Sequence, residues 1–189
     1  MNPPMNRQQR RQMARLEPAS ATRKATPSAA PVAALFAKAF QHFQAGRLTE
    51  AMDLYQQALV ADPRHAGSLH HLGLIAIKIG RPEIAVDMIG QAIALNEANA
   101  ALHHDICFAL IALDRHAEAA SHAQRAIALK PDYTSAYMLL GDSFLNRRQL
   151  DEAIAAYKQG LVLDPVHAEA HNNLAEALLA QGHLNEAAQ

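Results

Sequence analysis

The sequence predicts an all-α fold, a solenoid of helix–turn–helix repeats. Apolar residues recur at three- and four-residue spacing in stretches of about 13 residues, which short glycine-containing or polar turns separate. The same arrangement returns every 34 residues, a period typical of repeat proteins. The 189 residues are 50% hydrophobic and 19% charged, so the chain holds enough apolar material for a folded core.

Four rows of residues show the 34-residue period. One row consists of five alanines, Ala51, Ala85, Ala119, Ala153 and Ala187. The turn row consists of Gly46, Gly80, Asp114, Arg148 and Gly182. The other two rows are Tyr55, Ile89, Ala123 and Tyr157, and Ala58, Ala92, Ala126 and Gly160. Small residues let two helices approach closely and large ones fill the space between them, so these rows predict the helix contacts.

Prolines mark the ends of the repeats. Pro63, Pro131 and Pro165 share one position of the period, and Glu97 takes that position in the second repeat. A proline cannot extend a helix, because it lacks an amide hydrogen and its ring clashes with the preceding turn. The predicted units are 32–65, 66–99, 100–133, 134–167 and a partial unit at 168–189, about four and a half hairpins.

The first 31 residues differ from the rest of the chain. They hold five of the nine prolines and a charge of +5, from six basic residues and Glu17, which leaves the remainder at 11 − 17 = −6. The basic residues are Arg7, Arg10, Arg11, Arg15, Arg23 and Lys24. We expect a disordered basic arm rich in proline, serine and alanine. An organelle transit peptide is the alternative, since such peptides are also rich in arginine and serine and poor in acids.

Composition excludes several classes of function. The net charge of −1 gives no global field for nucleic acid, and no aromatic residue precedes Phe36 for base stacking, so a nucleic-acid partner is not expected. The longest apolar run, 106–113, has eight residues, too few to cross a membrane. Cys107 is the only cysteine, so the chain can form no internal disulfide and suits a reducing, cytoplasmic compartment.

The eleven histidines raise the question of a metal site. Adjacent residues on a helix point about 100° apart, so neither His70 with His71 nor His103 with His104 can chelate one ion. His103 and Cys107 have the better i, i+4 spacing, but Cys107 falls where helices touch, which predicts a packed thiol. The sequence also contains no phosphate-binding loop, nucleophile elbow or zinc-protease helix. We therefore predict no metal, no cofactor and no catalytic residue in this segment.

The repeats resemble the tetratricopeptide repeat over residues 32–189. The second unit matches through Leu69, Leu72, Gly73, Ala76, Ala85 and Ile89. The fourth matches through Tyr137, Leu140, Gly141, Phe144, Ala153, Tyr157 and Pro165. The first unit departs from the pattern at Lys38 and His42, as suits a repeat with no predecessor to cover it. The resemblance implies a right-handed superhelix whose first helices line a concave groove and whose second helices form the outside.

Modules of this family hold a peptide or a partner helix in that groove. Placing the family's groove positions on this chain gives Phe36, Phe40, Phe43, His70, His71, Leu74, Ile77, His104, Phe108, Ile111, Met138, Asp142, Leu145, Asn172, Asn173 and Glu176. The stripe of Phe36, Phe40 and Phe43 is the strongest candidate for an apolar anchor. In the alternative, the stripe packs against its own hairpin or the basic arm covers it.

Two family subtypes are not expected. Repeats that clamp the C-terminal carboxylate of chaperones present Lys and Asn in the first unit, Asn in the second, and Lys and Arg in the third. At those positions this chain has Phe36, Phe40, His71, Ala101 and Asp105, so no cation is available. The asparagine ladder of O-GlcNAc-transferase-like repeats is represented only by Asn173, because Ala37, His71, Asp105 and Leu139 fill the matching positions.

We therefore predict a scaffold that binds a protein or peptide partner and is not itself an enzyme. The alternative is a substrate-recruiting N-terminal region of a bacterial O-GlcNAc-transferase-like glycosyltransferase, methyltransferase or sulfotransferase, which segments 46–51 and 171–174 resemble. Self-association through the C-terminal end is a further expectation, because no second helix follows to cover Leu174, Leu178 and Leu184.

Overall fold

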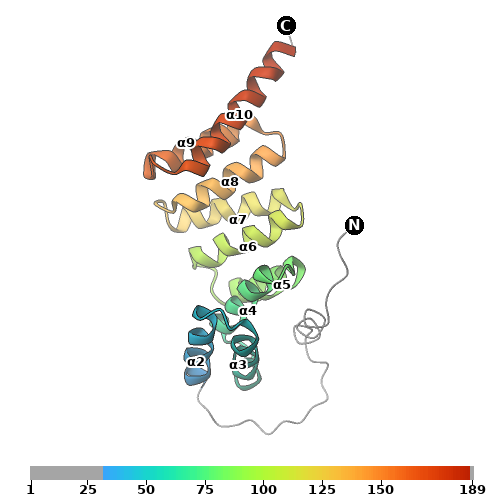
Figure 1. Cartoon of the computed structure of the whole chain (residues 1–189), viewed down its shortest axis with the longest axis vertical. Helices are drawn as coiled ribbons and strands as arrows, with labels where there is room; N and C mark the ends of the chain where they lie inside the picture. The colour runs from blue at the N-terminus through green and yellow to red at the C-terminus, as the bar shows by residue number, and fades with distance from the viewer. Residues whose placement is uncertain (1–31, 188–189) are drawn as a thin grey trace.

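The computed structural model describes residues 32–187, and the predicted basic arm at 1–31 lies outside them. Every secondary-structure element in this part is an α-helix (Figure 1). The helices are α2 (Val32–Gln44), α3 (Leu48–Ala61), α4 (Ala66–Lys78), α5 (Pro82–Leu95), α6 (Ala100–Ala112), α7 (His116–Leu129), α8 (Thr134–Asn146), α9 (Leu150–Leu163) and α10 (Ala168–Ala187). The predicted all-α solenoid is confirmed.

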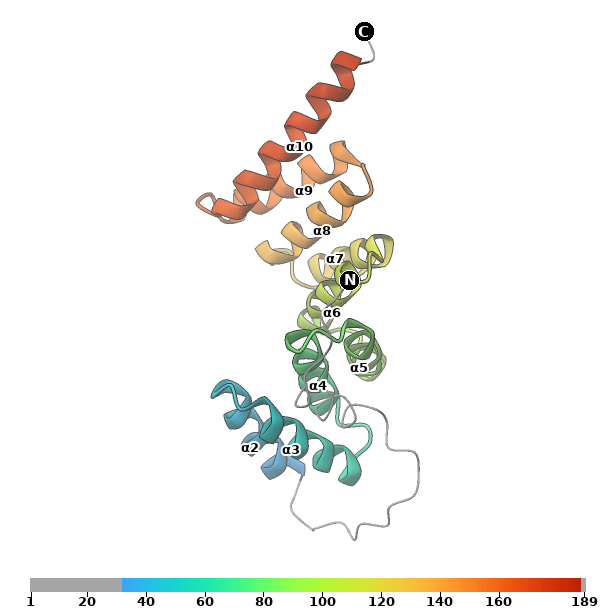
Figure 2. The same ribbon diagram turned by 45° about the vertical axis from the view of Figure 1, so that its right-hand side comes forward.

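The helices form antiparallel hairpins that stack along the long axis of the molecule, from α2 and α3 at one end to α10 at the other (Figures 1 and 2). Each second helix packs against its own first helix and against the first helix of the next hairpin. Successive first helices also contact one another, α4 with α6, α6 with α8 and α8 with α10. Among the described residues, no pair of successive second helices has contacts as extensive as these. The first helices therefore lie on the inner side of the curve. We call the surface that they present on this inner side, away from the second helices, the concave face.

The predicted rows of small and large residues form the core. Ala51, Ala85, Ala119 and Ala153 are fully buried between helices. The row of Tyr55, Ile89, Ala123 and Tyr157 is fully buried as well. The Tyr157 ring lies where a side chain on Gly141 of the facing helix would stand, and Ile89 lies in the same way against Gly73. A large residue of the second helix thus fills the space that a glycine of the first helix leaves, which sets the distance between the two helices.

The turn row ends each first helix in the same backbone conformation. Gly46, Gly80, Asp114 and Arg148 have φ of 72°, 73°, 56° and 60°, all in the left-handed region. The amide of the next residue then bonds to a carbonyl five positions back, as Arg47 N does to His42 O at 2.9 Å. This geometry satisfies free carbonyls at the helix end and reverses the chain toward the second helix. Asp114 and Arg148 adopt a conformation that glycine adopts at lower cost.

The fifth member of the turn row behaves differently. The sequence predicts a turn at Gly182 followed by the first turn of a second helix, whereas α10 continues through Gly182 to Ala187. The four earlier turns are held by a second helix that packs back on the first. In α10 continued helical hydrogen bonding through Gly182 satisfies the backbone instead.

Candidate functional site

One row of the 34-residue period lies on the first helices and consists of Phe40, Leu74, Phe108, Asp142 and Glu176, positions that the sequence predicts in the groove. Phe40 on α2 is 37% exposed and Phe108 on α6 is 46% exposed. Leu74 between them is half-buried, and the row turns acidic at Asp142. The face therefore changes from aromatic at its N-terminal end to acidic at its C-terminal end.

An aromatic cluster occupies the N-terminal end, with the imidazole of His71 at its centre. The rings of Phe36, Phe40 and Phe43 meet it edge-on, with centroids 5.3, 5.4 and 5.4 Å away. Phe36 and Phe43 also pack against the core of the first hairpin. The stripe therefore divides: Phe36 and Phe43 pack against that core, and Phe40 presents its ring to solvent.

Burial keeps His71 in its neutral form. Burial lowers the pKa of His71, and the hydrogen bond between Nδ1 and the Gly67 carbonyl, 2.9 Å long, opposes this only in part. A carbonyl can only accept, so Nδ1 carries the hydrogen. His122 on α7 is a second case, since burial and the nearby His103 lower its pKa.

These two histidines predict that acid destabilises the protein. Their folded pKa values lie below the unfolded value of about 6.5, so their full contribution is present above that pH and is lost as the pH falls toward the folded values. We expect the free energy of unfolding, measured by urea denaturation, to be lower at pH 5.5 than at pH 7.5. Stabilisation by Asp105, whose pKa is lowered, disappears only below about pH 4 and does not enter this window. His122→Gln should flatten the profile, and a protein that gains stability on acidification would contradict the assignment.

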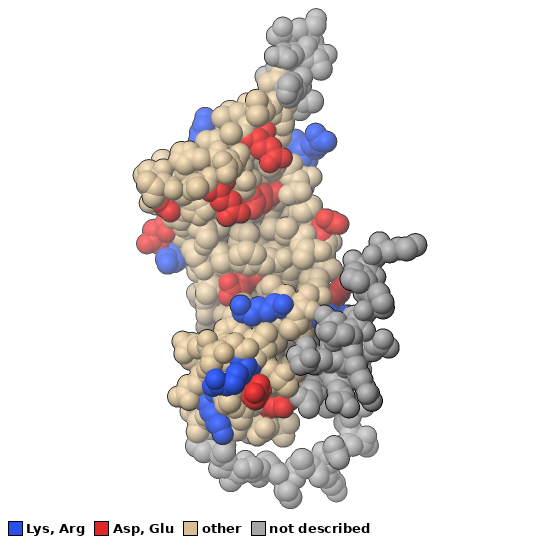
Figure 3. Space-filling model, in the orientation of Figure 1, with Lys and Arg blue, Asp and Glu red and all other residues tan. Residues whose placement is uncertain are grey.

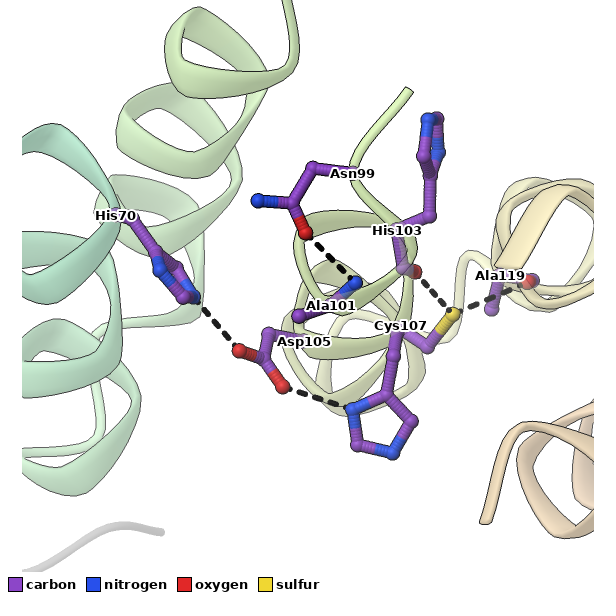
Figure 4. Close-up of polar contacts among 8 residues, drawn as sticks. His70, Asn99, Ala101, His103, Asp105, Cys107 and Ala119 are labelled. Atoms are coloured by element: carbon purple, nitrogen blue, oxygen red, sulfur yellow. Dashed lines mark hydrogen bonds and ion pairs between the residues drawn. The ribbon is translucent and has the colours of Figure 1, made fainter. Parts of the chain in front are cut away.

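A histidine–aspartate–histidine bridge joins α4 to α6 in the middle of the face (Figure 4). His70 Nε2 lies 2.7 Å from Asp105 Oδ2, and His104 Nδ1 lies 2.8 Å from Asp105 Oδ1. Burial alone would raise the pKa of Asp105, but the hydrogen bonds from His104 and His70 lower it. The carboxylate is therefore ionised and accepts from both rings.

His104 is enclosed by aromatic rings. It is 9% exposed, stacks on Tyr133 with centroids 4.7 Å apart and meets the edge of Phe108 at 5.2 Å. Its Nδ1 donates to Asp105, and its Nε2 is buried without a hydrogen-bond partner among the described residues. Tyr133 precedes α8 and belongs to no family groove position, so no motif in the sequence indicated its part here.

A third group of side chains joins α8, α9 and α10. Asp142 Oδ1 accepts hydrogen bonds from the Tyr157 hydroxyl at 2.7 Å and from Asn173 Nδ2 at 3.0 Å. Burial raises the pKa of Asp142, Glu169 and Glu176 raise it further, and the two hydrogen bonds only oppose this shift. The sequence placed Tyr157 in the core but gave no sign that its hydroxyl reaches the concave face.

The remaining predicted groove positions are buried to different degrees. Ile77, Ile111 and Leu145 are half-buried and pack against the core. Met138 is a correction, because it is 8% exposed and lies under α9 instead of facing the groove. Gly160 on α9 has no side chain and leaves the space that the Met138 methyl group fills.

Cys107 and His103 lie on the buried side of α6. The Cys107 thiol contacts the carbonyls of His103 and Ala119 at 3.1 and 3.4 Å, and burial raises its pKa to about 12 (Figure 4). His103 is occupied as well, with Nε2 at 3.1 Å from the Glu97 carbonyl and Nδ1 at 2.9 Å from His122 Nδ1. The predicted packed thiol is confirmed. No group of three metal-binding side chains occurs within the described range, and none of its helices is long and apolar enough to cross a membrane.

Family models decide the identity of the repeats. Models described as tetratricopeptide repeat match residues 32–65 and 66–99, and a third, described as TPR repeat, matches 141–182. The chain is a tetratricopeptide repeat protein. No curated protein matches its sequence.

Solved structures agree with this assignment of the tetratricopeptide repeat protein. The crystal structure of MamA is 26% identical with a TM-score of 0.76, over 83% of this chain and 86% of that one. The first repeat domain of Spaghetti (RPAP3), bound to the HSP90 peptide SRMEEVD, is 29% identical with a TM-score of 0.61, over 64% and 96%. PilF of Pseudomonas aeruginosa, at 20% identity and a TM-score of 0.71 over 80% and 69%, shares the fold. The resemblance to O-GlcNAc-transferase-like proteins stays a prediction.

Proposed function

We propose that the concave face binds a peptide segment or a helix of a protein partner. The observation that carries this proposal is the exposure of Phe40 and Phe108, two large aromatic side chains in one row of a rigid scaffold. Aromatic side chains lose little conformational entropy on binding and are frequent anchors at protein interfaces. The half-buried Leu74 continues the apolar surface between them.

The charges on this face favour an apolar or cationic partner segment. The HSP90 peptide bound to the Spaghetti domain, SRMEEVD, is acidic at its C-terminal end. In this chain the positions expected for a carboxylate clamp hold no lysine or arginine, and Asp105 occupies one of them. An acidic peptide would meet a carboxylate there, which disfavours it.

The test is a double substitution, Phe40→Asp with Phe108→Asp, in the full chain used as bait. We expect partner proteins recovered from the source cell and quantified by mass spectrometry to fall about tenfold or more, because two central anchors become charged. The matched control is Val60→Asp with Val162→Asp, two exposed apolar residues on the second helices α3 and α9. Circular dichroism shows whether each variant is folded. A folded Phe double variant that keeps every partner would refute the assignment.

A substrate-recruiting role for a larger transferase would use the same surface, so it is the alternative within this proposal. The reading frame beyond Gln189 distinguishes the two. A transferase domain encoded there would favour recruitment, and its absence would leave the scaffold.

A further inference from the structure

The C-terminal half of the concave face carries negative charge with no compensating cation of its own. Helices α6, α8 and α10 contain no lysine or arginine, but they hold Asp105, Asp142, Glu169 and Glu176. The first helices at the other end, α2 and α4, have Lys38 and Lys78 and no carboxylate. In Figure 3 acidic side chains gather over the α8–α10 end.

Asp142 is the centre of this negative region. Its hydrogen bonds come from Tyr157 and Asn173, both neutral, so no cation offsets its charge there. Glu169 and Glu176 lie one helical turn on either side of Asn173 and are exposed. Both act electrostatically on Asp142. The region is therefore suited to a positively charged side chain, with the exposed ring of Phe108 beside it in the same row.

The complementary charge lies in the same chain. Residues 1–31 carry +5, whereas residues 32–189 carry −6. Four of the six basic residues fall between positions 7 and 16, where Met13 and Leu16 are the large apolar residues. We propose that residues 7–16 bind the concave face of their own chain, with arginines against Asp142, Glu169 and Glu176 and an apolar side chain against Phe108.

The length of the chain permits this contact. Sixteen peptide units separate Leu16 from Val32, where α2 begins, and such a segment spans up to about 50 Å. Neighbouring first helices lie about 10 Å apart, so α8, three neighbours from α2, is roughly 30 Å away. The segment can thus reach α8 within one molecule.

The docked segment would occupy the surface proposed for the partner, so a partner has to displace it. The inference rests on the binding role of the concave face, but its test needs no partner. Because attraction between exposed charges is screened by salt, the contact should weaken as ionic strength rises.

Paramagnetic labelling of the full chain tests the contact. Gln12→Cys with a nitroxide gives one labelled site, since Cys107 is buried and its pKa of about 12 keeps the thiol unreactive. At low salt we expect the amide NMR signals of Phe108, Asp142 and Asn173 to lose more than half their intensity, those of Val60 and Val162 to stay, and a tenfold dilution to change nothing. Glu169→Gln with Glu176→Gln should restore the signals, and the matched control Glu83→Gln with Glu152→Gln on second helices should not.

Three results would overturn the proposal. Uniform intensities would show that the segment does not dock. Chains that carry the nitroxide but no ¹⁵N can be mixed with ¹⁵N chains that carry no nitroxide. Signal broadening in this mixture would show that the segment binds a second copy. Broadening that persists in Glu169→Gln with Glu176→Gln would show that charge is not the cause. None of these affects partner capture by the Phe40 and Phe108 variant, so the two proposals fail separately.

Discussion

Replacing Gly141 with alanine is expected to lower the free energy of unfolding by about 3 kcal/mol. An added Cβ would overlap three carbon atoms of the Tyr157 ring. That ring is fully buried and its hydroxyl is bonded to Asp142, so it cannot swing aside. Helices α8 and α9 would have to separate instead. Urea denaturation followed by circular dichroism measures the change.

Two other glycines serve as controls. Gly90→Ala adds a Cβ with no atom within 4 Å, so removing a flexible residue from α5 should stabilise the protein by up to about 1 kcal/mol. Gly160→Ala would overlap the Met138 methyl group, the movable end of a flexible side chain, and should cost less than Gly141→Ala. If Gly141→Ala had the same free energy of unfolding as Gly90→Ala, the close packing of α8 on α9 described above would be contradicted.

Replacing Asp105 with alanine is expected to cost about 2 kcal/mol. The change removes two charge-assisted hydrogen bonds, one from His70 on α4 and one from His104 on α6 itself. Such a bond contributes about 1.5–3 kcal/mol when it is fully buried. Each contributes less here, because the Asp105 side chain is 19% exposed. It also leaves the buried ring of His104 without its partner. The midpoint of urea denaturation measures the loss.

Asp105→Asn separates hydrogen bonding from charge. An amide accepts from His70 through its oxygen and donates to His104 Nδ1 through its nitrogen, so both contacts survive in weaker form. We expect about half the loss seen for alanine. His70→Ala with Asp105→Ala should cost less than the sum of the single changes, because the two residues share one bond. Full additivity, or an unchanged midpoint for Asp105→Ala, would contradict the bridge.

The fold could be predicted from the sequence because the residues that determine the helix packing recur at the same positions in every repeat. Ala119 and Tyr55 occupy rows whose sizes are dictated by the distance between helices, and that distance recurs in every hairpin. A single repeat would have been ambiguous, whereas matching positions in four repeats point to one packing arrangement. Gly182 is the exception, because α10 continues through it as a helix where the repeat pattern predicts a turn.

The site was predicted less well from the sequence, because the exposure of a side chain depends on residues of other helices that do not belong to its row. Phe36 and Phe40 are one helical turn apart, but only Phe36 reaches the core of the first hairpin. Met138 was expected in the groove and is buried because Gly160 on the facing helix leaves space. The bond from Tyr157 to Asp142 depends on how far a core side chain extends, which neither spacing nor composition reveals.

The stacking of the hairpins also bears on how fast the chain folds. Every closely packed pair of described helices is adjacent in sequence or separated by a single helix. Forming such contacts requires only short loops to close, and chains of this kind cross their folding barrier rapidly compared with sheets assembled from distant segments. Each hairpin has its partners within reach as soon as the next one is synthesised, so assembly can keep pace with translation from the first repeat onward.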